Sequence, residues 1–259
     1  MLDQKEVADK KEALEQAFKA LESFDWGTGI TIAAPGKPPV DSGVLAPIDD
    51  AVVASHGDAA ACKCLETRLA AVLKSKASRA AKDFACRKLT VIGTAESVPA
   101  LAALLEDKDL THMARYALER IPAPEAAQAM RDALPKLTGA LKVGVIGSLG
   151  ARCDGQSVAA LSALLADSDK AVAVAAASSL GKIGCAECAK ALSDCAKTAP
   201  AGVKPAVADG CLACAEHLLA DGKKADALLL YKSLVGEDQP KHVRLAATRG
   251  LLAVAGKKD

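Results

Sequence analysis

The cysteine residues are the side chains of this sequence whose types and spacing point most directly to chemistry. Cys185 and Cys188 form one C-x-x-C pair, and Cys211 and Cys214 form a second pair further along the chain. If both segments are helices packed antiparallel around a turn near residues 198–202, Cys188 lies level with Cys211 and Cys214. Facing thiolates in such a group can hold zinc or iron tetrahedrally, and two facing thiols can form a disulfide.

Packing is the competing interpretation of the same cysteines. Both pairs lie in helix-like segments, whereas zinc ribbons place their pairs in turns. Free cysteine is among the most buried residue types and packs as a small hydrophobic side chain. We therefore expect no cofactor and keep a zinc or iron site, or a disulfide, as the alternative for Cys185, Cys188, Cys211 and Cys214. His217, near the edge of the second pair's stripe, is a further candidate ligand in that alternative.

The remaining sequence contains no recognisable catalytic motif. It has no H-E-x-x-H, G-x-S-x-G, P-loop or G-x-G-x-x-G sequence, and its four histidines are scattered. Carboxylates lie at helix starts and turns, where helix capping explains them. These observations predict a protein that is not an enzyme.

Charge and hydropathy exclude several classes of protein. The 33 Lys and Arg balance 32 Asp and Glu for a net charge of +1, which argues against a dedicated nucleic-acid binder. The longest uncharged runs, such as 171–181, are far shorter than the roughly 20 residues that span a bilayer. Residues 1–24 do not resemble a signal peptide, and the nine cysteines do not resemble a secreted disulfide scaffold, so we expect a cytoplasmic protein.

The elements that must position these side chains are short helices. Residues 1–24 carry an apolar helix face, residues 25–47 form a Gly/Pro-rich loop that contains Trp26, and helices follow over residues 48–259. Asp58 and Ser78 are predicted N-caps. The predicted helices are 47–55, 58–74, 78–92, 95–106, 109–121, 124–136, 139–150, 155–166, 169–182, 185–197, 203–220, 224–235 and 239–255. Pro99 indicates that the helix predicted at 95–106 begins nearer Ser97.

The helices repeat in pairs. The segment from Val91 to Leu105 is similar to the segment from Cys153 to Leu165, and each is followed by an acidic turn and an Ala-rich helix. Corresponding turns fall near Gly93, Pro122, Cys153 and Gly184, which gives a period of about 30 residues. Two short helices in a unit of this length predict an all-α solenoid, because each pair buries its apolar face only against its neighbours.

The repeated segments resemble the HEAT-repeat superfamily, in particular the short bacterial type first described in phycobilisome lyases. The resemblance rests on residues 98–107 and 176–184, and it covers about residues 58–200. It implies a right-handed solenoid of stacked antiparallel helix pairs that mostly binds other proteins, and it does not imply catalysis. Residues 203–255 depart from the pattern and look more like a tetratricopeptide helix pair.

The resemblance also implies where a protein partner would bind, because the second helix of each pair lines the concave face in this repeat type. The residues predicted to line that face are Arg79, Lys82, Arg87, Met113, Arg115, Tyr116, Lys142, Lys170 and Val174. The loop with Trp26 is a second candidate contact. A chromophore-lyase-like accessory protein and a weak DNA binder with a basic groove remain alternatives to the protein-binding scaffold.

Overall fold

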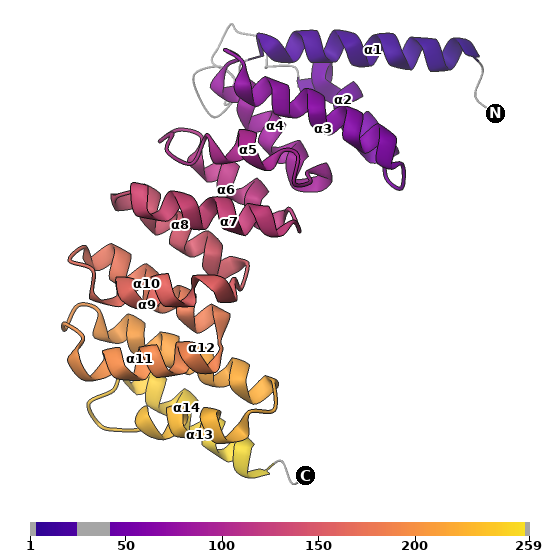
Figure 1. Cartoon of the computed structure of the whole chain (residues 1–259). Helices are drawn as coiled ribbons and strands as arrows, with labels where there is room; N and C mark the ends of the chain where they lie inside the picture. The colour runs from indigo at the N-terminus through magenta and orange to yellow at the C-terminus, as the bar shows by residue number, and fades with distance from the viewer. Residues whose placement is uncertain (1–3, 25–41, 257–259) are drawn as a thin grey trace, which may run out of the picture. The chain divides into compact units, whose positions relative to one another are not determined.

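The structure is a computed structural model that describes residues 4–24 and 42–256, and in these residues all regular secondary structure is helical (Figure 1). The prediction of an all-α fold is therefore confirmed. The chain divides into two compact units, Met1–Ala129 and Met130–Asp259. Trp26 and the rest of residues 25–41 lie outside the described residues.

The first unit contains the N-terminal helix and the first helix pairs. Its elements are α1 (Gln4–Glu22), the 3₁₀-helix η1 (Ser42–Leu45), α2 (Ala46–Ala54), α3 (Ala59–Lys74), α4 (Arg79–Ile92), α5 (Val98–Ala102) and α6 (Thr111–Arg120). The helix α7 (Pro124–Ala133) spans the boundary between the two units.

The second unit continues the same alternation of helices. Its elements are η2 (Leu134–Lys136), α8 (Gly139–Ala151), η3 (Gly155–Ser157), α9 (Val158–Ala163), η4 (Leu164–Ala166), α10 (Lys170–Ile183), α11 (Ala186–Thr198), α12 (Lys204–Ala220), α13 (Lys224–Ser233) and α14 (Lys241–Gly256).

Each unit is built as two layers of stacked helix pairs. In the first unit α3 packs beside α5 and α4 packs beside α6; in the second, α9, α11 and α13 follow one another, as do α8, α10, α12 and α14. We call α3, α5, α7, α9, α11 and α13 the first helices and α4, α6, α8, α10, α12 and α14 the second helices. This stacking of antiparallel pairs is the α-solenoid arrangement that the repeats predict.

The helix starts follow from local capping. The Asp58 carboxylate accepts hydrogen bonds from the N–H groups of Ala60 and Ala61, and the Ser78 hydroxyl accepts one from Ala81. Both predicted N-caps are therefore confirmed, and they satisfy N–H groups that have no partner inside the helix.

Two predicted boundaries are wrong. The helix predicted at 95–106 begins at Val98 with Ser97 as its N-cap, so the start indicated by Pro99 is confirmed, but the helix ends early, at Ala102. Helical structure also begins at Ser42, inside the loop predicted at 25–47. Leu45 is buried there, and the burial of its apolar side chain stabilises the helical turn despite the nearby Gly and Pro residues.

Buried apolar side chains and one arginine of α3 attach α1 to the first unit. Ala17, Phe18 and Leu21 are buried on one face, as the sequence pattern predicts. The Arg68 guanidinium of α3 lies 3.8 Å from the centre of the Phe18 ring and pairs with the Glu15 carboxylate at 2.8 Å. A cation over an aromatic ring and a two-pronged ion pair thus connect α1 to α3.

The second helices of the second unit approach one another at small residues. A Cβ atom added at Gly181 of α10 would lie 2.8 Å from Gly210 of α12, and one added at Gly150 of α8 would overlap Ser179 of α10. The Ser179 hydroxyl in turn donates to the Ile146 carbonyl of α8 at 2.9 Å. These contacts leave no room for a larger side chain between the helices.

Candidate interaction surface and thiol cluster

The basic residues predicted for the concave face lie on second helices, and three of them contact the turn that precedes the next second helix. Arg79, at the start of α4, donates from Nε to the Asp109 carbonyl at 3.3 Å. Lys142 pairs with Asp167 at 3.1 Å. The Lys170 side chain packs against Gly202, so closely that a Cβ atom added there would lie 2.8 Å from the Lys170 Cε. These side chains therefore hold neighbouring repeats in register.

The Lys142–Asp167 pair is reinforced by the acidic turn. The Asp169 N–H donates to the Asp167 carboxylate at 2.9 Å, and Asp169 itself caps α10 through the Ala171 N–H. The Asp169 N–H and then Lys142 hold the pKa of Asp167 below its usual range. The turn before α6 has the same form, since Asp107 accepts from the Asp109 N–H.

The other predicted surface residues are more available for contact. Arg87 is exposed and pairs within α4 with Asp83, while Lys82, Met113, Arg115 and Val174 are half-buried. Tyr116 of α6 is 38% exposed, and the Arg120 guanidinium lies 4.7 Å from its ring centre. Burial lowers the pKa of Arg115 from its ordinary value. Tyrosine and arginine are enriched among the interface residues that contribute most to binding free energy, and here they lie exposed and in contact with each other.

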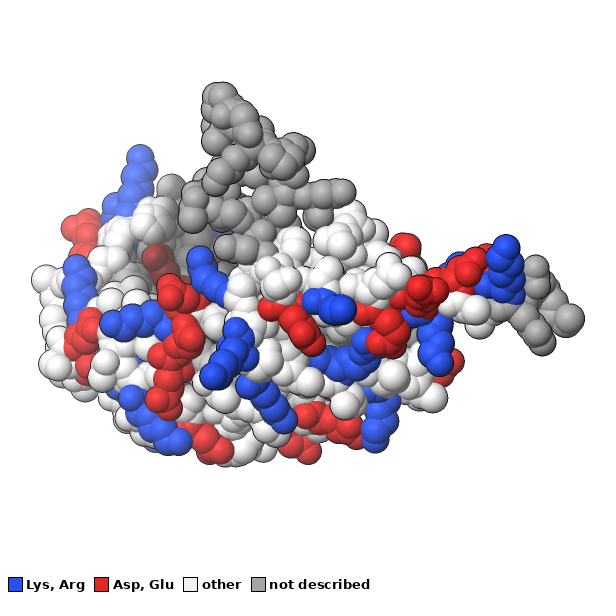
Figure 2. Space-filling model, turned by 90° about the horizontal axis from the view of Figure 1, so that it is seen from above, with Lys and Arg blue, Asp and Glu red and all other residues white. Residues whose placement is uncertain are grey.

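The face of the molecule seen in Figure 2 carries charges of both signs. Basic and acidic side chains are interspersed there without a continuous area of either sign. That face does not supply the run of phosphate contacts that nucleic-acid binding requires.

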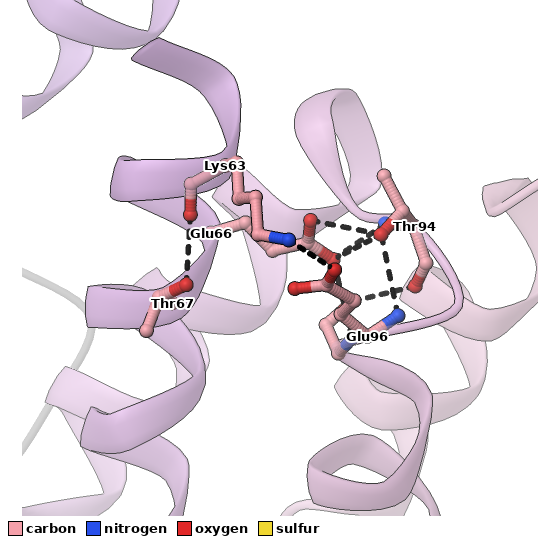
Figure 3. Close-up of polar contacts among 6 residues, drawn as sticks. Lys63, Glu66, Thr67, Thr94 and Glu96 are labelled. Atoms are coloured by element: carbon pink, nitrogen blue, oxygen red, sulfur yellow. Dashed lines mark hydrogen bonds and ion pairs between the residues drawn. The ribbon is translucent and has the colours of Figure 1, made fainter. Parts of the chain in front are cut away.

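A buried carboxylate that the sequence analysis did not single out connects α3 to the turn before α5 (Figure 3). Glu66 is only 2% exposed, and it accepts hydrogen bonds from the Thr94 N–H at 2.6 Å, the Thr94 hydroxyl at 2.9 Å and the Ser97 N–H at 3.2 Å. The exposed Lys63–Glu96 pair, at 2.7 Å, lies beside it. We call this contact between a first helix and the next turn the junction contact of the first unit.

The second unit has a junction contact at the corresponding place. Arg131 of α7 pairs with Asp154 at 2.6 Å, and both side chains are largely buried, 16% and 11% exposed. Asp154 also accepts a hydrogen bond from the Ser157 hydroxyl. Because Thr94 and Asp154 occupy equivalent positions of the sequence repeat, the alignment of repeats is the signal that identifies both contacts.

The thiols gather where the turn after α10 meets α11 and α12. The sulfur atoms of Cys185 and Cys188 are 3.0 Å apart, and the Cys214 thiol donates to the Cys185 carbonyl at 3.5 Å. Cys211 instead lines a cavity of about 480 Å³ with Ser193 of α11 and other residues. The structure thus brings together three of the four cysteines singled out in the sequence.

Burial keeps most of these thiols protonated. It raises the pKa of Cys188, Cys211 and Cys214 to about 12 each, with further contributions from neighbouring thiols. Metal binding requires thiolates, and raised pKa values oppose their formation. Among the described residues, no group of three or more His, Cys, Asp or Glu side chains is arranged to hold a metal ion.

The family model for HEAT repeats matches residues 138–210. The matched segment comprises α8 to α11 and the first part of α12, so it contains Lys142, Lys170 and the Cys185–Cys188 pair.

Solved structures similar to the chain are helical proteins of low sequence identity. Two are engineered proteins. The first is 20% identical with a TM-score of 0.39, and the match covers 95% of this chain and 69% of the engineered chain. The second is 19% identical with a TM-score of 0.33, and the match covers 95% of this chain and 96% of the engineered chain. A third is human deoxyhypusine hydroxylase in complex with glycerol, 16% identical with a TM-score of 0.37 over 97% of this chain and 99% of its own. No curated protein matches the chain.

Within residues 4–24 and 42–256, no helix combines the length and the apolar composition needed to cross a membrane.

Proposed function

We propose that this chain is a non-catalytic scaffold that binds another protein through the exposed side chains of its second helices. HEAT repeats in residues 138–210 support a repeat scaffold for protein interaction. The observation that carries the choice of surface is Tyr116 of α6, which is exposed and lies under the Arg120 guanidinium.

The chemistry of the neighbouring second helix fits the same role. Arg87 is exposed on α4, which packs beside α6, and Lys82 of α4 is half-buried. Arginine and tyrosine supply large contact areas and directed hydrogen bonds, so they dominate binding energy at many protein interfaces. The partner surface that suits these cations and an aromatic ring is acidic.

Not every basic residue of the second helices belongs to the proposed surface. Arg79, Lys142 and Lys170 contact the turn before the next second helix, so changing them would alter the stacking of repeats as well as any binding. The informative positions are therefore Tyr116 and Arg87, whose described contacts stay within their own helices.

The proposal is tested by photo-crosslinking in the cells that make the protein. A benzophenone amino acid placed at position 116 of the full chain is expected to form a discrete protein–protein adduct on irradiation. The same probe at Thr67, exposed on the first helix α3, is the matched control and is expected to form none. Equal adducts at both positions, or none at position 116, would overturn the proposal.

The contribution of charge is tested in the same system. Arg87→Glu is expected to reduce the adduct formed from position 116 at least about fivefold, the factor that corresponds to about 1 kcal/mol of binding free energy. The reversal Lys190→Glu, on the first helix α11, is the control and should leave the yield unchanged.

A further inference from the structure

The Cys185–Cys188 pair occupies a position of the repeat that elsewhere carries oxygen-bearing side chains. Counting from the aligned turns at Gly93, Cys153 and Gly184, the pair corresponds to Thr94 and Ser97 in the first unit and to Asp154 and Ser157 in the second. In all three cases the two residues stand three apart at the turn into a first helix.

That geometry places the two sulfur atoms against each other. Cys185 is the N-cap of α11, and its Sγ accepts a hydrogen bond from the Cys188 N–H at 3.3 Å. This contact folds the Cys185 side chain over the first turn, so the two sulfur atoms lie only 3.0 Å apart. One turn of helix thus already holds the two thiols in the proximity that a disulfide needs.

The two thiols differ in access to solvent. Cys185 is partly exposed, whereas Cys188 is buried, with 0% of its surface accessible. An accessible first cysteine at a helix N-terminus and a buried second cysteine three residues later form the arrangement required for attack and resolution.

The surroundings supply charged groups and a third thiol. The Cys214 thiol of α12 donates to the Cys185 carbonyl, and the charged side chains of Glu187, on α11, and Lys223, before α13, lie near these cysteines. His217 of α12 packs directly against Gly184, whose φ of +68° makes the turn into Cys185. The pair therefore lies at a polar edge of the second unit that small reactants can reach.

We propose that Cys185 and Cys188 form a redox-active dithiol that exchanges with disulfides of low molecular weight, a function independent of partner binding on the second helices. The Cys185 thiolate attacks one sulfur of a small disulfide such as oxidised glutathione. The S–S bond of that molecule breaks, one glutathione leaves as thiolate, and a mixed disulfide forms on Cys185.

The second step closes the intramolecular bond. Cys188 attacks the Cys185 sulfur, its proton passes to the departing sulfur, and the second glutathione leaves as a thiol. Two protein thiols are oxidised by two electrons in total, and one small disulfide is reduced to two thiols. The product is a Cys185–Cys188 disulfide within the first turn of α11.

The test uses the full reduced chain in mixtures of reduced and oxidised glutathione. After an acid quench and alkylation with iodoacetamide, trypsin cleavage at Lys182 and Lys190 releases residues 183–190, which contain no other cysteine. As the share of oxidised glutathione rises, this peptide is expected to lose both alkyl groups and to appear two hydrogens lighter than the dithiol. Circular dichroism checks that the chain stays helical.

Three variants separate this mechanism from general thiol oxidation. Cys188→Ser is expected to leave Cys185 as a persistent glutathione adduct, because the resolving thiol is lost, and Cys185→Ser should leave Cys188 unmodified. Cys195→Ser, which removes a partly exposed thiol of the same helix, should leave the wild-type behaviour unchanged. A peptide that stays fully alkylated at every ratio, or a disulfide from Cys185 to Cys214, would overturn the proposal.

Discussion

The junction contacts of the two units hold the same place in the repeat with opposite chemistry. In the first unit the first helix supplies the carboxylate, Glu66, and the following turn supplies N–H and hydroxyl donors at Thr94 and Ser97. In the second unit the turn supplies the carboxylate, Asp154, and the first helix supplies the cation, Arg131. The repeat therefore fixes where a polar contact is needed and leaves open which partner carries the charge.

The two carboxylates meet different needs. N–H groups at a buried helix start cost free energy when they are left unpaired, and Glu66 accepts those of Thr94 and Ser97. Asp154 instead accepts from the Arg131 guanidinium and the Ser157 hydroxyl, and its side chain caps no N–H group.

The second helices show a further difference between the units. Three residues before the aligned turns, the first unit has Thr90, whereas the second has Gly150 and Gly181. The second helices of the second unit come close enough that Gly181 leaves no space for a Cβ next to Gly210. We therefore expect the second unit to depend on backbone proximity and the first on side-chain packing.

The largest expected effect is that of Gly181→Ala. The added methyl group would lie 2.8 Å from the backbone of Gly210, which cannot move aside cheaply, so we expect about 3 kcal/mol of lost unfolding free energy. Urea unfolding followed by circular dichroism measures it. The control is Gly147→Ala on α8, where an added Cβ meets nothing within 4 Å and helix propensity should make the change neutral or stabilising. Equal losses in both variants would contradict the close approach.

The next effect is that of Asp154→Ala at the junction of the second unit. Removing the carboxylate takes away the Arg131 ion pair in a largely buried place, and we expect a loss of about 2 kcal/mol. The exposed Lys197–Asp194 pair provides the control, since Asp194→Ala should change unfolding free energy by less than about 0.5 kcal/mol. If the two substitutions cost the same, the junction contact contributes nothing specific.

A slightly smaller effect is expected for Glu66→Ala in the first unit. The substitution removes the acceptor of the Thr94 N–H and leaves the Ser97 N–H only its longer bond to the Thr94 carbonyl, at a cost of about 1–2 kcal/mol. Glu96→Ala, which removes only the neighbouring exposed pair with Lys63, should cost less than about 0.5 kcal/mol. A stability loss in Glu96→Ala that matched Glu66→Ala would remove the distinction between buried and exposed carboxylates.

The smallest expected effect concerns the pH dependence of the first unit. Burial raises the pKa of Cys86 to about 12 from an ordinary value near 9.0. A raised pKa stabilises the folded chain below pH 9, and this contribution is lost as pH rises toward 12 because the unfolded thiol ionises first. Between pH 8 and pH 10 the loss is about 1 kcal/mol. Cys86→Ala should therefore show a smaller fall in unfolding free energy over that range, whereas Cys64→Ala, at an exposed thiol, should match the wild type. If Cys86→Ala had the same pH profile as the wild type, the pKa of Cys86 would not be raised in the folded chain.

The sequence predicted the helices far better than the site. Apolar spacing and caps such as Asp58 and Ser78 are local signals, so the helix pairs and their order follow from them. Glu66 could not be recognised in the same way, because a glutamate on a helix normally faces solvent and its burial depends on a turn about 30 residues later.

The thiols illustrate a second limit of sequence reasoning. The expected group of Cys185, Cys188, Cys211 and Cys214 assumes helix faces that meet squarely, but Cys185 is an N-cap and its side chain folds back over its own helix. The close pair is therefore set by capping geometry, and Cys211 faces elsewhere. The expected absence of a cofactor and the alternative of a zinc or iron site through all four residues both stay untested, as does the cytoplasmic location.

The short first helix α5 has a consequence for local stability. It spans five residues, between the 14 residues of α4 and the 10 of α6. So few turns provide little cooperative hydrogen bonding, and segments of this kind open independently of the rest of a domain. Among the helices of the first unit, amide hydrogen exchange should consequently be fastest in α5, at Val98–Ala102, and slowest along α4. The first helix α5 then opens locally while the hydrogen bonds of the second helix α4 stay formed.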